Sequence, residues 1–122
     1  MKLFDPQIYP RKLYILDSIE ELSFFEGRGG EVLESSSDKT VDASVWTCVK
    51  KDNGAYCVVV HFYSVTIDTI AHEAVHIANS IFEDCSIDFN YLLDEHYAYF
   101  VGWIAGRIAE AYEINIVKKK KK

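Results

Sequence analysis

The sequence of 122 residues predicts a single α+β domain, in which a small antiparallel sheet packs against two long helices. Two observations predict this fold. The stretches 45–49 and 56–62 are rich in β-branched and aromatic residues and flank an Asn53-Gly54 turn, which is typical of a β-hairpin. Two longer downstream segments repeat their apolar residues with the period of an α-helix. Hydrophobic residues make up 49% of the chain, enough to build a core around these elements.

Two short elements are expected before the hairpin. Residues 12–16 (KLYIL) form an apolar run after Pro10, which reads as a strand or as the start of the fold. Ser18 is followed three residues later by Glu21, the pattern of a capping box, and it predicts a short helix over 18–25.

The hairpin turn also predicts how its two strands pair. Asn-Gly is the favoured sequence for a two-residue turn, and such a turn fixes the register of the flanking strands. It would place Val49 opposite Val58, and Thr47 opposite Val60.

Both long helices follow the hairpin. The first is expected over 66–82, capped by Ser64 or Thr66, with its apolar residues on one stripe. The second is expected over 92–112. It contains two small residues four positions apart, where another helix could approach closely: Gly102 and Gly106.

Charge argues against a nucleic-acid partner. The formal net charge is −6, but five of the 13 basic residues are the consecutive lysines 118–122, so eight basic residues face 19 acidic ones in the rest of the chain. Phosphate contacts need a basic face, which such a body lacks. We therefore expect a single domain over 1–117, followed by a disordered, solvated lysine tail over 118–122.

Cysteine usage and hydropathy indicate a cytoplasmic protein. Cys48, Cys57 and Cys85 are odd in number and form no CxxC pair, so neither a disulfide framework nor a cysteine metal site is expected. The N-terminal residues do not have the pattern of a signal peptide, and no segment is apolar for long enough to span a membrane. The sequence leaves the oligomeric state open.

The first long helix contains HEAVH, with His72, Glu73 and His76. Residues four apart lie on one face of a helix, so the two imidazoles can reach one Zn²⁺ at about 2.0–2.1 Å each. Glu73 points away from the metal position but can reach a water held there, where a carboxylate acts as a general base. HExxH also arises by chance in unrelated helices, so an ordinary amphipathic helix is the competing interpretation.

A catalytic zinc needs a third protein ligand and an open position for water. Downstream of the motif, seven side chains have suitable chemistry: Glu83, Asp84, Cys85, Asp88, Asp94, Glu95 and His96. We favour Glu95, because it lies near the start of the second helix and is separated from His76 by eighteen residues. This separation leaves room for the first helix to end and for the chain to return to the metal. His96 is expected to face solvent.

HEAVH, followed after eighteen residues by the glutamate of LLDEHYAYFVG, resembles the gluzincin metallopeptidases, particularly the alanyl-aminopeptidase-like members. The likeness covers about residues 70–102, and the short chain is also similar, more loosely, to small HExxH proteins of phages and other mobile elements. The resemblance implies a minimal zincin-like core with His72, His76 and Glu95 as zinc ligands and Glu73 as general base. It also implies that the strand 57–62 is an edge strand, along which an extended peptide binds.

This chain departs from the family pattern in two respects. Thermolysin-like enzymes place an aspartate four residues after the third ligand, where this chain has Tyr99, and no exopeptidase signature is present. Four side chains remain candidates for stabilising a transition state: Tyr97, Tyr99, His61 and Tyr63. His61 reads more simply as a packing residue on a strand.

The predicted function is zinc-dependent peptide-bond hydrolysis by a metal-activated water with Glu73 as the general base. The expected partner is a peptide or protein substrate. One alternative is a catalytically silent zinc-binding protein that regulates or assists a partner of a mobile element. The other is a metal-free structural protein, whose helices simply pack.

Overall fold

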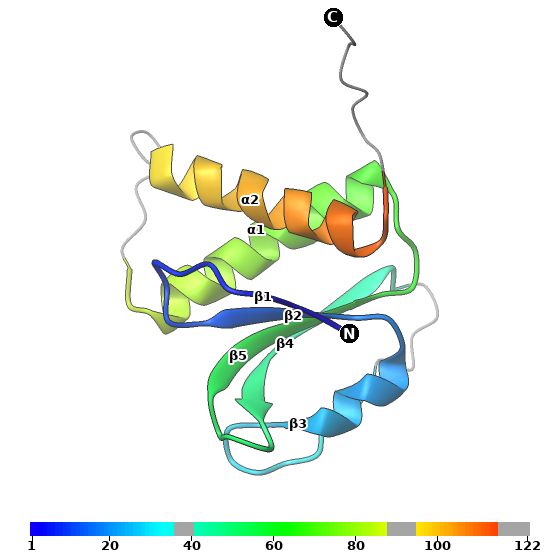
Figure 1. Ribbon diagram of the computed structural model, residues 1–122, viewed down its shortest axis with the longest axis vertical. Coiled ribbons are helices and arrows are strands. Elements are labelled where there is room, and N and C mark those ends of the chain that lie inside the picture. Colours follow the sequence, from blue (N-terminus) through cyan, green and yellow to red (C-terminus); the bar gives the residue numbers. More distant parts are fainter. Residues whose placement is uncertain (36–40, 88–94, 115–122) are drawn as a thin grey trace, which may run out of the picture.

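The computed structural model describes residues 1–35, 41–87 and 95–114 and has the α+β class that the sequence predicts (Figure 1). The lysine tail, residues 92–94 of the expected second helix, and the candidate ligands Asp88 and Asp94 lie outside the described residues. In chain order the elements are β1 (Lys2–Phe4), β2 (Lys12–Leu16), the 3₁₀ helix η1 (Ile19–Phe24), β3 (Phe25–Glu26), β4 (Ala43–Lys50), β5 (Tyr56–Phe62), α1 (Ile67–Asp84) and α2 (Glu95–Ala111).

The five strands form one mixed sheet in the order β1-β2-β5-β4-β3. Three of the four pairings are antiparallel, but β2 runs parallel to β5. The expectation of a purely antiparallel sheet was therefore wrong, and β1 was not predicted. Both β2 and β5 are nearly continuous apolar runs, which is typical of central strands that are covered on both faces.

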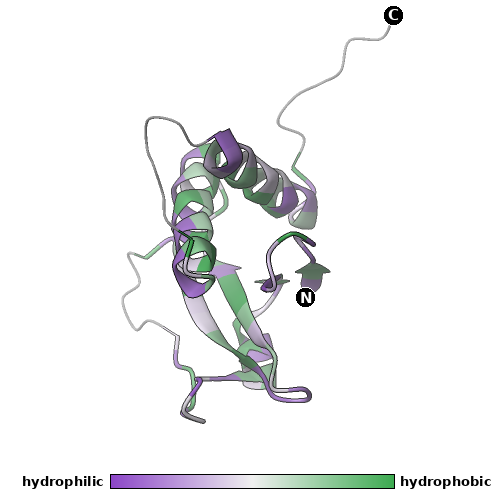
Figure 2. Ribbon diagram, turned by 90° about the vertical axis from the view of Figure 1, so that its left-hand side faces the viewer, coloured by the Kyte–Doolittle hydropathy of each residue, from purple (hydrophilic) through white to green (hydrophobic). Residues whose placement is uncertain are grey.

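Two hydrophobic clusters cover the two faces of the sheet. Alternate side chains of β2 and β5, such as Leu13 and Val60, pack against α1 and α2 on one face. The intervening side chains, such as Leu16 and Val59, form a second cluster beside η1 on the other face. In Figures 1 and 2 the two helices lie together above one face of the sheet, and η1 lies on the opposite side.

The β4–β5 hairpin forms as predicted, but its register differs by two residues. Val49 pairs with Tyr56, and Thr47 pairs with Val58. The loop has four residues, because the Lys50 amide donates to the Ala55 carbonyl at 3.0 Å and the Gly54 amide donates to the Lys50 carbonyl at 2.7 Å. Gly54 has a φ of 67°, which lets it end this longer loop. Lys51 and Asp52 therefore belong to the turn.

η1 and α1 begin where their capping residues predict. Ser18 and Glu21 form the expected capping box, although the turn they start is a 3₁₀ helix. Thr66 caps α1, its hydroxyl accepting a hydrogen bond from the Thr69 amide at 3.1 Å. α1 continues to Asp84, two residues beyond the expected end.

Two arginines hold the carboxylate of Asp84 at the end of α1. Arg11 donates through Nε at 2.8 Å, and Arg28 donates through Nη1 at 2.7 Å and also through Nη2. Arg28 also lies over the ring of Tyr56, with its Cζ atom 4.2 Å from the centroid. The hydrogen bond from Arg28 holds the pKa of Asp84 below its usual value. This cluster joins the helix end to two loops distant in sequence.

α2 does not use its glycine pair as expected. A Cβ atom built on Gly102 or Gly106 would meet no heavy atom of the described residues within 4 Å. The prediction of a close helix approach at these positions was wrong, because larger side chains make the contact with α1. Among them are Phe100 and Ile104, which are buried in the shared core. None of the described helices is long and apolar enough to cross a membrane.

Candidate metal centre

His72 and His76 lie side by side on the solvent-facing side of α1. Both side chains are exposed, and their Nε2 atoms are 3.0 Å apart. The opposite side of the helix is apolar and packs against the sheet through residues such as Ala74 and Ile77. The amphipathic pattern of the helix thus determines that both imidazoles face away from the core.

The spacing of the two nitrogens is close to what one tetrahedral zinc requires. With bonds of about 2.05 Å and a tetrahedral angle, two imidazole nitrogens on one Zn²⁺ lie about 3.3 Å apart. The observed 3.0 Å differs by a shift that a small side-chain rotation provides. The same geometry also permits one imidazole to donate a hydrogen bond to the other, depending on the tautomers. The pair His72 and His76 fits a shared metal as two of its ligands.

An open pocket of about 420 Å³ adjoins the first histidine. Its walls come from the start of β4 and from the first turns of α1, and its lining residues are Val41, Asp42, Ala43, Asp68, Thr69, His72 and Glu73. The Asp42 carbonyl accepts hydrogen bonds from the amides of Tyr63 and Ser64, at 2.7 and 3.1 Å, which fixes this wall to the chain entering α1. The lining of this pocket thus includes three acidic residues and one histidine.

Glu73 is half-buried and lines this pocket together with His72. Its side chain leaves the helix about 100° around the axis from that of His72. The candidate base and one candidate ligand thus open into the same space, as the HExxH hypothesis requires. Asp42 and Asp68 were not singled out from the sequence, because neither belongs to a recognisable motif.

Glu95 is the first residue of α2, and its side chain is exposed. The first turn of α2 contacts the C-terminal half of α1, where Tyr97 donates a hydrogen bond to Asn79 Oδ1 at 2.7 Å and its ring contacts that of Phe82. Within residues 1–35, 41–87 and 95–114, no three His, Cys, Asp or Glu side chains are grouped so that they could hold a metal ion. Glu95 as third ligand therefore stays a prediction.

The predicted edge strand is in fact a central strand. β5 pairs with β2 on one side and with β4 on the other, so no peptide can add to it. The error arose because the pairing of β2 with β5 joins distant segments. One open edge is instead found on β4, whose residues 43–48 have no strand partner on the side away from β5 in the described part of the chain. This edge begins at the pocket beside His72.

None of the other candidate side chains lines the pocket beside His72. His61 is only 7% exposed on β5, and its ring packs edge-on against Tyr63, which agrees with a packing role. Burial lowers the pKa of His61. Tyr99 is 76% exposed on α2, so it does not replace an aspartate that orients a ligand. His96 is exposed, as expected.

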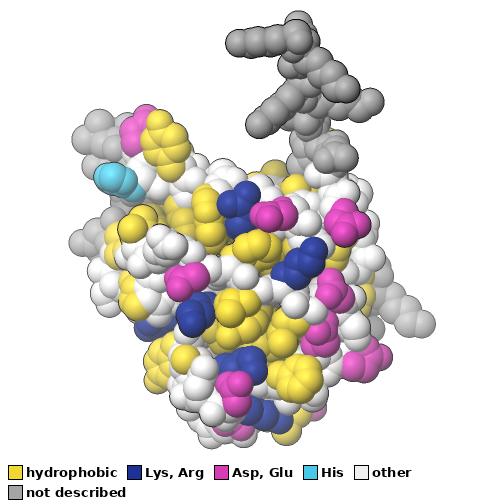
Figure 3. All heavy atoms as spheres, in the orientation of Figure 1, with side chains coloured by type: hydrophobic (Ala, Val, Ile, Leu, Met, Phe, Trp, Pro, Cys, Tyr) yellow, Lys and Arg dark blue, Asp and Glu magenta, His cyan; other side chains and the backbone are white. Residues whose placement is uncertain are grey.

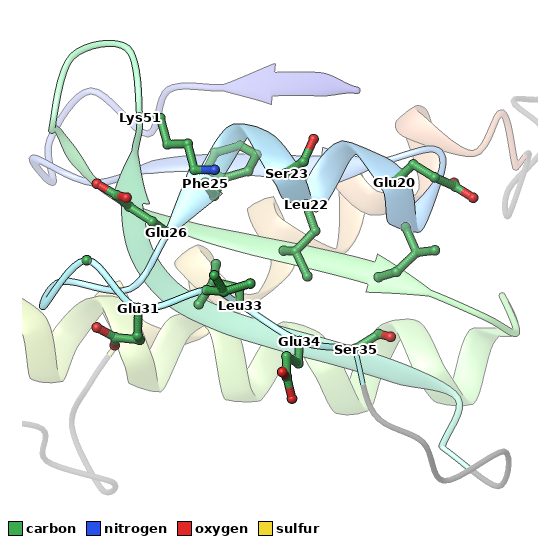
Figure 4. Close-up of a pocket in the computed structure, with 13 residues that line it drawn as sticks. Glu20, Leu22, Ser23, Phe25, Glu26, Glu31, Leu33, Glu34, Ser35 and Lys51 are labelled. Atoms are coloured by element: carbon green, nitrogen blue, oxygen red, sulfur yellow. The ribbon is translucent and has the colours of Figure 1, made fainter.

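A larger pocket, of about 570 Å³, lies elsewhere (Figure 4). It is formed by η1 and the stretch 30–35, on the sheet face opposite the long helices. Figure 4 shows the carboxylates of Glu20 and Glu34 pointing away from its centre. On the face seen in Figure 3, basic and acidic side chains are interspersed, with apolar groups between them. Neither feature competes with the histidine pair as a catalytic constellation.

No family model, curated protein or solved structure matches this chain. The placement of His72, His76 and Glu73 therefore carries the functional argument.

Proposed function

We propose that this protein is a small zinc-dependent peptidase with His72 and His76 as metal ligands and Glu73 as general base. One observation carries the proposal. The two exposed Nε2 atoms lie 3.0 Å apart, beside a pocket that Glu73 lines. An amphipathic helix needs no histidine pair on its solvent face, whereas a shared metal needs this spacing.

When bound, zinc would lower the pKa of a coordinated water to about 7 and polarise a peptide carbonyl. The residues of the chain supply the remaining roles. Glu73 takes a proton from water in the pocket and later gives it to the leaving amine. The walls at Asp42 and Thr69 confine the scissile bond beside Glu73. We propose Glu95, the first residue of α2, as the third ligand.

The open edge of β4 is the place where we propose that substrate binds. An extended peptide can add to a free strand edge through main-chain hydrogen bonds, and residues 43–48 offer such an edge. Because the pocket begins at Ala43, a peptide on this edge passes beside His72 and Glu73.

Metal binding is the first test. Apo protein is titrated with Zn²⁺ by calorimetry, and metal content after dialysis is measured for the wild type, His72→Ala, His76→Ala, Glu95→Ala and His96→Ala. We expect one zinc per chain in the wild type and much less in the first three variants. His96→Ala is the matched control, because it removes an exposed histidine outside the pair, and it should keep the metal. Equal zinc content in His72→Ala and wild type would refute the site.

Turnover is the second test. A mixed library of unstructured peptides is incubated with zinc-loaded wild type or Glu73→Gln, and new termini are identified by mass spectrometry. We expect cleavage by the wild type only, at unchanged zinc content, because glutamine cannot accept the proton. Cleavage by Glu73→Gln at the wild-type rate would exclude Glu73 as the base.

A second candidate function is zinc binding without turnover, in a regulatory or accessory protein. It is favoured by the placement of Glu95, which is not grouped with the two histidines among the described residues. Two imidazoles alone would leave the metal weakly held, with water in its other positions. Zinc binding that survives Glu95→Ala, together with no cleavage of any library peptide, would favour this candidate over the peptidase.

A further inference from the structure

Cys48 and Cys57 face each other across the β4–β5 hairpin. They are paired residues on neighbouring strands, and their Sγ atoms are 3.9 Å apart. Both are free thiols that lie in the hydrophobic cluster beside η1. The register expected from a two-residue turn would have placed Cys48 opposite Val59, so the four-residue loop is what brings the thiols together.

A small pocket adjoins one of the two thiols. A pocket of about 100 Å³ opens beside the hairpin loop, and its lining residues are Pro10, Lys12, Tyr14, Lys50, Asn53, Ala55, Tyr56 and Cys57. Both thiols are buried, at 0% and 1% exposure for Cys48 and Cys57, but Cys57 forms part of this wall and Cys48 is not among the lining residues. A space of this size admits a few water-sized molecules and excludes a bulky tripeptide disulfide.

The surroundings of the pair favour ionisation of Cys57. A hydrogen bond from the Cys48 thiol lowers the pKa of Cys57, and the positive charges of Lys50 and Arg28 add to this effect against burial. The same hydrogen bond and burial raise the pKa of Cys48. The directions of these pKa shifts favour Cys57 over Cys48 as the attacking thiol.

We propose that Cys57 and Cys48 form a peroxide-reactive dithiol, in which Cys57 is the attacking thiol and Cys48 resolves it into an intramolecular disulfide. This modification site is separate from the histidine pair, and it does not depend on zinc or on peptidase activity. The reactant is a small hydroperoxide, because the pocket beside Cys57 has room only for a small oxidant.

Two steps complete the reaction. The Cys57 thiolate attacks one oxygen of hydrogen peroxide, the O–O bond breaks, and one water leaves after a proton is taken up, giving a sulfenic acid. The Cys48 sulfur then attacks Cys57 Sγ, an S–S bond forms as the S–O bond breaks, and a second water leaves with the Cys48 proton. The two thiols lose two electrons and the peroxide is reduced. Directly paired strand residues have Cα separations that a disulfide can span.

Intact mass and peptide mapping test the proposal on the full chain. The protein is treated with hydrogen peroxide, quenched with catalase, denatured and alkylated. We expect the wild type to lose two hydrogen atoms and to take up one alkyl group in place of three, at Cys85. The peptide map should contain a Cys48–Cys57 cross-link, and dithiothreitol should restore three alkylation sites. Cys85→Ala is the matched control and should form the same cross-link.

The order of attack is tested with single variants and dimedone, which traps sulfenic acids. Cys48→Ala should accumulate a dimedone adduct at Cys57, while Cys57→Ala should give none at Cys48. Equal trapping in the two variants would overturn the assignment of roles. The wild-type peptide map does not depend on whether the variants fold. If excess peroxide oxidises Cys85 but leaves Cys48 and Cys57 without a cross-link, the dithiol proposal is wrong.

Discussion

Replacing Asp84 by asparagine tests the ion cluster that ends α1. Asp84 receives charged hydrogen bonds from Arg11 and Arg28, and its side chain is 12% exposed. A hydrogen bond to a charged group contributes about 1.5–3 kcal/mol when buried. The arginine side chains are 18% and 31% exposed, so solvent screens part of that energy. We expect Asp84→Asn to lower the free energy of unfolding by about 2 kcal/mol.

Thermal and urea unfolding measure this loss. For a chain of this length, about 2 kcal/mol corresponds to a Tm lower by roughly 8 °C. Asp52→Asn is the matched control, because Asp52 pairs with Lys50 at 3.1 Å but is 67% exposed. That change should cost less than about 0.5 kcal/mol. If Asp84→Asn destabilises no more than Asp52→Asn, the cluster does not stabilise the fold.

The pH dependence of the Asp84 variant gives an independent check. The pKa of Asp84 is lowered in the folded state from 3.8, so its stabilisation is fully present above pH 3.8 and is lost as pH falls through the lower folded-state value. The asparagine side chain of the variant cannot titrate. The difference in stability between wild type and Asp84→Asn should therefore be constant near neutral pH and should shrink in strong acid. A difference that does not change with pH would mean that the charge of Asp84 is irrelevant.

Two further predictions concern the helices and the sheet. Gly102→Ala and Gly106→Ala should each raise the free energy of unfolding, measured in urea, by about 0.5–1 kcal/mol. The reason is that the added Cβ atom meets open space and that alanine favours helix more than glycine does. A loss of stability would instead reveal a contact at that face of α2. Burial lowers the pKa of His61 from 6.5, so its stabilisation is present above pH 6.5 and is lost as pH falls through the folded-state value. The urea midpoint of His61→Gln should fall less between neutral pH and about pH 5 than that of wild type, and parallel curves would contradict this assignment.

Elements with local signals were predictable from the sequence. The capping residues Ser18 and Thr66 mark the starts of η1 and α1, and the helical period places His72 and His76 on one face. These features depend on residues within one or two helical turns of each other. Capping side chains form hydrogen bonds with nearby backbone groups, and residues four apart share a helix face. Local interactions are therefore sufficient to determine the helix starts and the position of the histidine pair.

Features that join distant segments were not predictable. The parallel pairing of β2 with β5 has no local sequence signal. Because this pairing was not predicted, β5 was expected to be an edge strand, whereas it is a central strand. The hairpin register failed because Asn53-Gly54 fits both a two-residue and a four-residue turn. The distance from Glu95 to the histidines depends on where α2 packs along α1. Side-chain packing between the helices sets that position, and the sequence separation of the residues does not.

The parallel pairing of β2 and β5 also determines the order in which the chain can fold on the ribosome. Leu13, Ile15 and Leu16 are fully buried in the finished sheet, yet each is synthesised 45 residues before its partner on the neighbouring strand β5. The β4–β5 hairpin closes a short loop and can form as soon as it emerges. The β2 strand can pair with β1 at once, but its other edge must remain unpaired, with apolar side chains exposed, until the hairpin is complete. The β4–β5 hairpin is thus the template onto which the earlier segment docks, and a delay in synthesis before residue 62 would prolong the interval in which β2 can aggregate.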